Sequence, residues 1–235
     1  MARYDADQLK IFAGRHHCDV AIRLSEHLEL ELGDAKTHVF PDGELLVKVE
    51  EDVRGRDCFI VISTCEPVND NLMELLIFLD CLRRASAKTV TVVLPYFGYG
   101  RQDRKSEGRV PITAKLVANL ITAGKADRVI ALDLHAAQLQ GFFDLPVDHL
   151  SATPVFHEYF SGIREQLGDL CLVSPDVGNV KVAEGFANLL GGDLAIINKR
   201  RLSGSEVTTG HIIGDVKGKT VLMVDDMIST RKKRV

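Results

Sequence analysis

Short apolar segments rich in β-branched residues alternate along the chain with longer segments that have the periodicity of an amphipathic helix. We expect strands at residues 10–12, 45–49, 58–62, 90–94, 129–132, 170–173, 194–197 and 221–224. Strands that alternate with helices are joined by crossover connections, which produce parallel strand pairs. The pattern therefore predicts an α/β fold with mainly parallel sheets covered by helices on both faces.

Four apolar stripes mark the expected helices. They lie within residues 20–32, 72–82, 112–120 and 182–190. Asn71, followed by Glu74 three residues later, precedes the second stripe in a pattern close to a capping box. Gly124 and Gly191 follow the last two stripes, as is typical of the C-terminal end of a helix.

Residues 144–154 interrupt the alternation with two prolines and little periodicity. We therefore expect a domain boundary near residue 150, with domains at residues 1–150 and 151–235. The two halves share the same order of strands and helices, which predicts two similar domains. The second has room for only three strands, so we expect its sheet to be incomplete and the chain to be truncated at its C-terminus.

The composition is that of an ordinary globular protein, with 46% hydrophobic and 26% charged residues. The net charge of −4 gives no electrostatic reason to expect nucleic-acid binding. No apolar run approaches the roughly 18–20 residues that span a membrane, and the N-terminus lacks the layout of a signal peptide. Five scattered cysteines without a C-x-x-C pair predict reduced, mostly buried thiols and a cytoplasmic protein.

Polar residues follow several of the expected strands, at the sheet edge where ligands bind in α/β folds. Asp225 and Asp226 come directly after residues 221–224, and Ser229 and Thr230 follow them. Adjacent carboxylates suit a hydroxylated, magnesium-bearing ligand such as a ribose. A hydroxyl-rich turn with free backbone N–H groups suits its phosphate.

Residues 95–105, after another expected strand, combine aromatic residues and glycines with the cations Arg101, Arg104 and Lys105. This combination favours a nucleotide site over a solvated basic loop. His135 also follows a strand, where it could bind a metal, although a lone histidine more often has a structural role.

Three further segments could bind a ligand, and for two of them a second interpretation remains open. Asp176 follows a strand and offers a hard oxygen ligand that suits Mg²⁺. Residues 198–205 carry three consecutive cations and predict either a mobile loop that binds phosphates or a solvated charged run. The simplest interpretation of residues 40–44 is a surface turn, but Asp42 and Glu44, which lie beside an aromatic residue, could also bind an amino-bearing ring.

Residues 224–230 resemble the sugar-phosphate loop of the phosphoribosyltransferase superfamily, but residues 231–235, of which the first four are basic, stand where its glycines are expected. Together with further segments in the same order, the chain resembles the ribose-phosphate pyrophosphokinase family from Leu9 to about Thr230. Those segments are residues 69–75, 109–115, 140–144 and 211–215. The resemblance implies two similar phosphoribosyltransferase-like α/β domains, the first on the ATP side and the second, truncated, on the ribose 5-phosphate side.

The same resemblance implies transfer of a pyrophosphoryl group from MgATP to the 1-hydroxyl of ribose 5-phosphate, which leaves AMP. Lys199 and Arg201 would stabilise the transferring phosphates, and His135 and Asp176 would bind Mg²⁺. The implied ATP-binding residues are Phe40, Asp42, Glu44, Arg101, Gln102 and Asp103. The implied ribose 5-phosphate-binding residues are Arg201, Asp225, Asp226, Ser229 and Thr230.

The family resemblance also implies a homo-oligomer, with dimers assembled into hexamers, and regulation by phosphate and ADP. Two alternatives remain at this point. A type I phosphoribosyltransferase shares the Asp225–Asp226 loop but consumes the activated sugar, and the nucleotide-like segments at residues 40–44 and 101–102 argue against it. The other alternative is a non-catalytic regulatory subunit or an inactive truncated remnant. Only the ending at residues 231–235 favours it.

Overall fold

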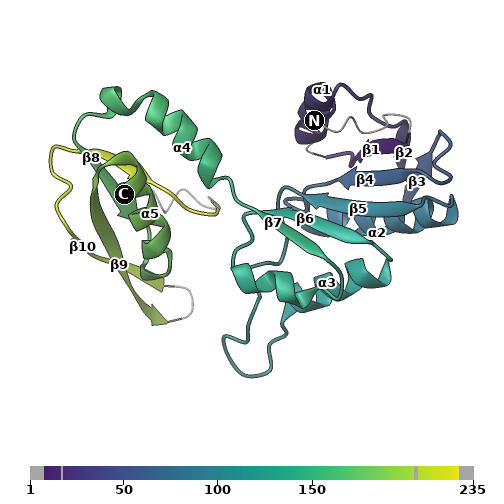
Figure 1. Cartoon of the computed structure of the whole chain (residues 1–235). Coiled ribbons are helices and arrows are strands. Elements are labelled where there is room, and N and C mark those ends of the chain that lie inside the picture. The colour runs from purple at the N-terminus through teal and green to yellow at the C-terminus, as the bar shows by residue number, and fades with distance from the viewer. Residues whose placement is uncertain (1–7, 17, 204–205, 228–235) are drawn as a thin grey trace. The chain divides into compact units, whose positions relative to one another are not determined.

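The computed structural model describes residues 8–16, 18–203 and 206–227, and only the backbone of residues 199–203 and 206–210. It divides into two compact units, Met1–Ser151 and Ala152–Val235, each with its own sheet (Figure 1). Helices and strands alternate in both units, and most pairs of neighbouring strands within the sheets are parallel. The predicted α/β fold class is therefore confirmed.

The sheet of the first unit has the strand order β1-β4-β5-β6-β7, and all of its pairs are parallel. These strands are β1 (Leu9–Ala13), β4 (Asp57–Val61), β5 (Thr89–Leu94), β6 (Arg128–Leu132) and β7 (Val147–Leu150). From β4 to β7, each strand along the chain lies beside the previous one, always on the same side of it. Since crossovers of this kind are right-handed, the helices between these strands must lie on one face of the sheet.

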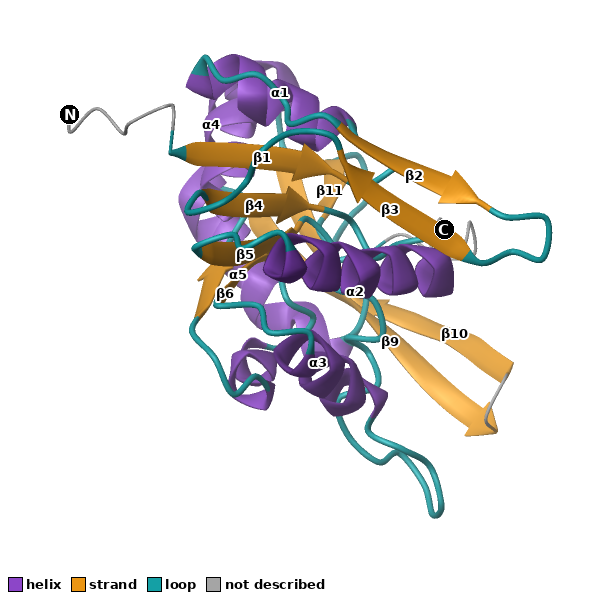
Figure 2. Cartoon of the chain, turned by 90° about the vertical axis from the view of Figure 1, so that its right-hand side faces the viewer, coloured by secondary structure: helices purple, strands orange, loops and turns teal. Residues whose placement is uncertain are grey.

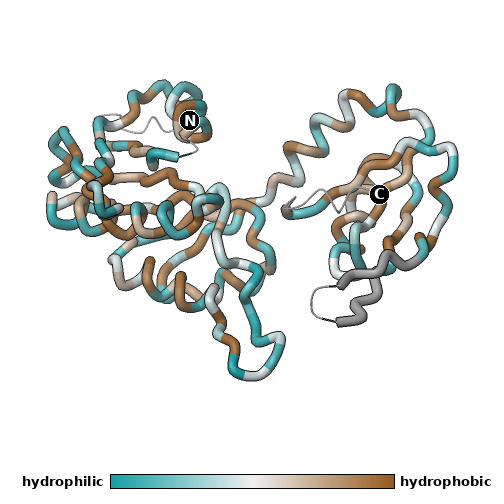
Figure 3. The backbone as a smooth tube through the Cα atoms, turned by 180° about the vertical axis from the view of Figure 1, so that it is seen from behind, coloured by the Kyte–Doolittle hydropathy of each residue, from teal (hydrophilic) through white to brown (hydrophobic). Residues whose placement is uncertain are grey.

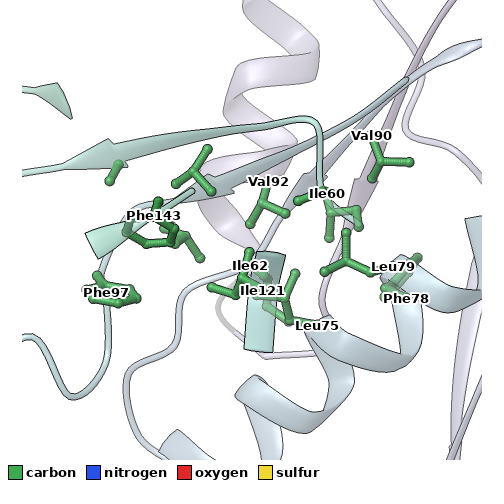
Figure 4. Close-up of a cluster of buried hydrophobic side chains, with 14 of the residues drawn as sticks. Ile60, Ile62, Leu75, Phe78, Leu79, Val90, Val92, Phe97, Ile121 and Phe143 are labelled. Atoms are coloured by element: carbon green, nitrogen blue, oxygen red, sulfur yellow. The ribbon is translucent and has the colours of Figure 1, made fainter. Parts of the chain in front are cut away.

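Figure 2 shows α2 (Val68–Arg84) and α3 (Thr113–Ala123) side by side on that face. Their buried side chains form the main core with the strands (Figure 4). The labelled core residues are Ile60, Ile62, Leu75, Phe78, Leu79, Val90, Val92, Phe97, Ile121 and Phe143. On the opposite face α1 (Asp19–Leu28) packs through Ala21 against Ile11 and Val61, while Leu132 and Leu150, the last residues of β6 and β7, stay exposed. Helices therefore cover this second face only in part.

The predicted break at residues 144–154 contains regular structure that the sequence interpretation missed. It holds β7 and the start of α4 (Thr153–Gly162), with η1 (Ala137–Phe142) just before it. Pro146 directly precedes the strand, and Pro154 lies in the first turn of the helix. Proline is tolerated at both places because neither requires its missing N–H group.

A two-stranded antiparallel hairpin, β2 (Ala35–Val39) with β3 (Leu45–Val49), accompanies the first unit (Figure 2). The backbone N–H of Phe40 donates to the Glu44 carbonyl at 2.8 Å and closes the turn between the strands. Gly43 has φ of 93°, which a residue without Cβ adopts readily. The sequence interpretation identified β3 and the turn but missed β2, most of which is exposed.

The helix α2 corrects the predicted capping box. It begins at Val68 after Pro67, so Asn71 and Glu74 lie inside the helix rather than at its start. Both side chains are 0% exposed. Asn71 Nδ2 donates to the Cys65 carbonyl at 3.0 Å, and Glu74 accepts hydrogen bonds from outside the helix.

The helix α3 presents its predicted apolar stripe to the exposed side. Ile112, Leu116 and Leu120 are 37%, 54% and 38% exposed. The side chains that this helix buries against the sheet are Ala114, Val117, Ala118 and Ile121. Ala114, Val117 and Ala118 are small enough to allow the helix to approach the sheet closely. Figure 3 shows that hydrophobic segments run through both units.

The described residues of the second unit form four strands, one more than predicted, in the order β10-β9-β8-β11. They are β8 (Leu170–Ser174), β9 (Asp193–Ser203), β10 (Glu206–Ile213) and β11 (Thr220–Met223). The pairs β8–β9 and β8–β11 are parallel, and β9–β10 is antiparallel. The unit's remaining elements are α4, η2 (Arg164–Leu167), η3 (Val177–Asn179) and α5 (Val180–Leu190), which ends at Gly191 as predicted.

The strand β9 corrects the loop predicted at residues 198–205. Its backbone continues through Lys199 and Arg201 to Ser203, because β10 offers an antiparallel partner. The β-branched residues Val207, Thr208 and Thr209 favour that partner strand. Pairing with the next strand along the chain therefore extends β9, whose apolar part ends at Ile197.

The cysteines are all free, but only Cys58 and Cys171 are buried. The prediction of mostly buried thiols is therefore wrong for Cys18, Cys65 and Cys81, which are partly exposed. Burial raises the pKa of the Cys58 thiol to about 11, which keeps it protonated at neutral pH. Within the part of the chain that the structure describes, no helix has the length and apolar character to cross a membrane.

Candidate active site

Two polar loops of the first unit are tied together where β4 and β5 end. The Thr64 hydroxyl, after β4, donates to the Tyr96 carbonyl at 2.9 Å and accepts from the Gly98 N–H at 2.7 Å. A Cβ atom at Gly98 would lie 2.4 Å from the Thr64 carbonyl oxygen, so the backbone can approach this closely only at a glycine. The aromatic segment that begins at Pro95 is thereby held at the carboxyl edge of the sheet.

The next loop, from residue 101 to residue 112, is closed at its base by Gln102. The Gln102 carbonyl accepts from the Ala114 N–H at 3.2 Å, and its side-chain oxygen accepts from the Thr113 hydroxyl. Gln102 therefore has a structural partner at the start of α3 that the sequence did not reveal. Arg101 is exposed and Asp103 is partly exposed beside it.

The loop that carries His135 is held by β7. The Asp133 N–H donates to the Leu150 carbonyl at 2.9 Å, and the Leu134 N–H donates to His149 Nε2 at 3.1 Å. Asp133 has φ of 43°, in the left-handed region, and the exposed His135 follows two residues later. His149 escaped the sequence interpretation because its strand was not recognised.

The turn between β2 and β3 presents the predicted acidic residues to solvent. Asp42 and Glu44 are exposed, and Asp42 Oδ1 accepts from the Glu44 N–H at 3.1 Å. The Phe40 ring is 40% exposed and meets the His38 ring edge-on, with centroids 5.1 Å apart. One short turn therefore offers two carboxylates next to an accessible aromatic ring.

In the second unit the loops after β8 and β11 lie next to each other, because these strands are parallel neighbours. Asn179 joins them, since its Nδ2 donates to the Val224 carbonyl at 2.7 Å. Asp176 Oδ1 accepts from the Asn179 N–H at 3.1 Å, and Asp225 Oδ1 accepts from the Asp226 N–H at 3.1 Å. The structure thus brings Asp176 close to the Asp225–Asp226 pair, and Asn179 is the residue that the sequence interpretation missed.

The basic residues predicted to be catalytic belong to the neighbouring strand β9. Its Ile196 pairs with Ser174, the last residue of β8, so the backbone at Lys199 and Arg201 extends past the carboxyl end of β8. The side chains of Lys199 and Arg201 lie outside the described part of the structure, and so do Ser229 and Thr230. The β9 backbone therefore leads toward the same edge as Asp176.

Within the described residues, no group of three or more His, Cys, Asp or Glu side chains is arranged to hold a metal ion. His135 belongs to the first unit and Asp176 to the second. The oxygen donors around Asp176 and Asp225 nevertheless fit Mg²⁺, because this ion retains several waters and binds proteins through one or two carboxylates together with substrate phosphates.

A family model described as the N-terminal domain of ribose phosphate pyrophosphokinase matches residues 9–124. The ribose-phosphate pyrophosphokinase of Rhodopirellula baltica is 58% identical over 224 residues, which are 95% of this chain and 71% of that protein. The chain belongs to the ribose-phosphate pyrophosphokinase family. The enzyme of the same name from Campylobacter jejuni is 52% identical, over 94% of this chain and 71% of that protein.

A solved structure of this family agrees with the fold. The phosphoribosylpyrophosphate synthetase from Mycobacterium smegmatis matches with a TM-score of 0.88 and 42% sequence identity, over 96% of this chain and 74% of that one. The match therefore includes residues of both units. The phosphoribosyltransferase-like fold inferred from the sequence is therefore confirmed for this pyrophosphokinase.

Proposed function

We propose that this ribose-phosphate pyrophosphokinase transfers the pyrophosphoryl group of MgATP to the 1-hydroxyl of ribose 5-phosphate, giving phosphoribosyl pyrophosphate and AMP. The observation that carries the proposal is the carboxylate cluster of the second unit. Asn179 joins the loop of Asp176 to the end of β11, next to Asp225 and Asp226. This cluster lies at the carboxyl edge of a parallel sheet, where α/β folds bind their ligands.

We assign ribose 5-phosphate to the second unit. Asp225 and Asp226 would accept hydrogen bonds from the ribose hydroxyl groups, as adjacent carboxylates at a strand end can. Ser229 and Thr230 would bind the 5-phosphate, and Arg201 would contribute positive charge. This assignment is supported by the resemblance of residues 224–230 to a sugar-phosphate loop and by the backbone course of β9.

We assign ATP to the first unit, around two loops. Asp42 and Glu44 would accept hydrogen bonds from the adenine amino group beside the Phe40 ring, and both carboxylates are exposed. Arg101 would bind the phosphates, with Gln102 and Asp103 alongside. The backbone contacts of Gln102 support this role, because they hold Arg101 at the base of the loop.

The reaction needs positioned charge more than covalent catalysis. Lys199 and Arg201 would neutralise the charge that develops on the transferring phosphates, which is where such side chains have their largest effect. His135 in the first unit and Asp176 in the second would each bind Mg²⁺, which further neutralises the phosphate oxygens when it is bound. Asn179 and His149 would keep the loops of these two residues in place.

The direct test is AMP formation by the purified chain from ATP and ribose 5-phosphate, with Mg²⁺ and phosphate present. We expect turnover that depends on both substrates and is abolished in His135→Ala, a control that also excludes contaminating activity. If His135→Ala is as active as the wild type, His135 has no role in the reaction. A folded chain that binds ATP without forming AMP would contradict the proposed activity and favour a regulatory subunit.

We also propose that the protein forms a homo-oligomer in the cytoplasm, with phosphate and ADP as regulators. The helix α4 supports the oligomer, because its Val155, Phe156 and Tyr159 are 68%, 46% and 63% exposed. Apolar side chains gathered in this way are typical of interaction surfaces. We expect sedimentation equilibrium to give a multiple of the chain mass, and Tyr159→Glu to lower it. A wild-type monomer at all concentrations would contradict the oligomer.

A further inference from the structure

The helix α2 buries a charged residue in the middle of the first unit. Glu74 is 0% exposed and lies on the same helix as the core residues Leu75, Phe78 and Leu79. Burial of a carboxylate is costly unless other groups pair with it and donate hydrogen bonds to it. The partners of Glu74 therefore indicate what this residue holds in place.

Those partners come from two separate elements. The Thr37 hydroxyl, in β2, donates to Glu74 Oε1 at 2.6 Å. The backbone N–H of Arg15, directly after β1 and Gly14, donates to the same oxygen at 3.1 Å. The Arg15 guanidinium forms an ion pair with Glu74 Oε2 at 3.6 Å and with Asp70 at 3.5 Å. One carboxylate thus connects a helix, the hairpin and the loop after β1.

The geometry of the pair argues against a role in stability alone. Neither Arg15 Nε nor Glu74 Oε2 has a hydrogen-bond partner among the described residues, although both atoms are buried. Buried ion pairs of this kind contribute little net stability compared with apolar residues of the same volume, but they can specify one arrangement of the surrounding elements. The arrangement specified here includes the hairpin.

Thr37 is the central residue of β2, and its register partner is Val47 in β3. Val47 is 5% exposed and belongs to the main core, so the two residues fix the hairpin where it meets α2. The turn with Asp42 and Glu44 lies at the far end of these two strands, beyond Val39 and Leu45. A change in the direction of the hairpin at Thr37 would therefore move both carboxylates.

We propose that Glu74 is a positioning residue for ATP, which acts through Thr37 to direct the β2–β3 hairpin and its Asp42–Glu44 turn. The proposal rests on the assignment of that turn to adenine under the proposed function. Glu74 itself does not contact the nucleotide. Its loss should therefore change the affinity and selectivity for the nucleotide and leave the sugar-phosphate site in the other unit unchanged.

The main variant is Thr37→Val, which keeps the shape of the side chain and removes the hydroxyl donor to Glu74. We expect the KM for ATP to rise about ten- to hundredfold, because a hydrogen bond to a buried carboxylate is lost. The KM for ribose 5-phosphate should stay within twofold, and the preference for ATP over GTP should fall. Thr37→Ser, which retains the hydroxyl, is the matched control and should restore the wild-type KM for ATP.

The outcomes separate this proposal from the proposed function. Wild-type AMP formation and a raised KM for ATP in Asp42→Asn would establish the activity and the adenine assignment. An unchanged KM for ATP in Thr37→Val would then overturn only the positioning role, as would an equal rise in both KM values. If the wild type binds ATP but forms no AMP, titration calorimetry of ATP with the same variants applies the same criteria. If it does not bind ATP, both proposals fail.

Glu74→Gln provides a second measurement, since it retains an acceptor oxygen for Thr37 but removes the charge opposite Arg15. We expect a smaller rise in the KM for ATP than in Thr37→Val, together with a lower midpoint of thermal unfolding. If Glu74→Gln does not fold, the KM values of Thr37→Val test the proposal. If Glu74→Gln folds and raises the KM for ribose 5-phosphate as much as the KM for ATP, the proposal is overturned.

Discussion

Lys199→Ala is expected to lower kcat for AMP formation by about 10²–10³-fold, with little change in the KM for ribose 5-phosphate. The physical reason is that a positive charge aimed at the transferring phosphates acts mainly in the transition state. The backbone supports this place for Lys199, because β9 continues past the carboxyl end of β8 toward the loop of Asp176. Steady-state kinetics with both substrates varied gives the two constants separately.

Lys217→Ala is the control for Lys199, since Lys217 is an exposed lysine of the same unit, in the turn between β10 and β11. Its N–H donates to Asp215 Oδ1, an interaction that does not involve the side-chain charge. We expect its kcat to stay within twofold of the wild type. A reduction of less than threefold in Lys199→Ala would contradict the role assigned to Lys199.

Phe78→Ala is expected to lower the free energy of unfolding of the first unit by about 3–5 kcal/mol. Phe78 is 0% exposed, and its ring lies 6.1 Å from the Phe12 ring in the core between α2 and the sheet. Truncation would remove the ring and leave a cavity that this well-packed core can fill only in part. Hydrogen exchange of the β4 and β5 amides under native conditions reads the stability of this unit separately from the other.

Phe40→Ala is the matched comparison, because the Phe40 ring is 40% exposed in the β2–β3 turn. We expect its effect on stability to be at most about 0.5 kcal/mol, as is usual for exposed positions, while the KM for ATP rises. The two phenylalanines should therefore separate stability from nucleotide binding. Equal exchange rates in Phe78→Ala and the wild type would contradict the core assignment.

The sequence was sufficient to find the strands whose residues are buried on both faces. The strands β4, β5 and β8 consist mainly of apolar and β-branched residues, because a strand between two layers has no solvent-facing side. The strands β2 and β7 were missed since they are partly exposed and their composition resembles that of loops. β10 was missed because its mixed polar and β-branched sequence is not an apolar run, and its antiparallel pairing with β9 does not appear in the sequence pattern.

Some residues of the candidate site could also be found from the sequence, and others only from the structure. Polar residues at the ends of apolar runs identified Asp176, His135 and the Asp225–Asp226 pair, since that pattern is local in the sequence. The residues that hold them, Asn179 and His149, act through bonds to segments 45 and 15 positions away. No local pattern marks such partners.

Glu74 shows the difference most directly. The spacing of Asn71 and Glu74 matches a helix start, and the sequence by itself determined only that a helix with an apolar stripe lies here. The tertiary structure decided that the helix begins earlier, at Val68, and that Glu74 meets Thr37 and Arg15. A carboxylate's role depends on which donors surround it, and only the packing of the hairpin and the β1 loop against α2 brings those donors to it.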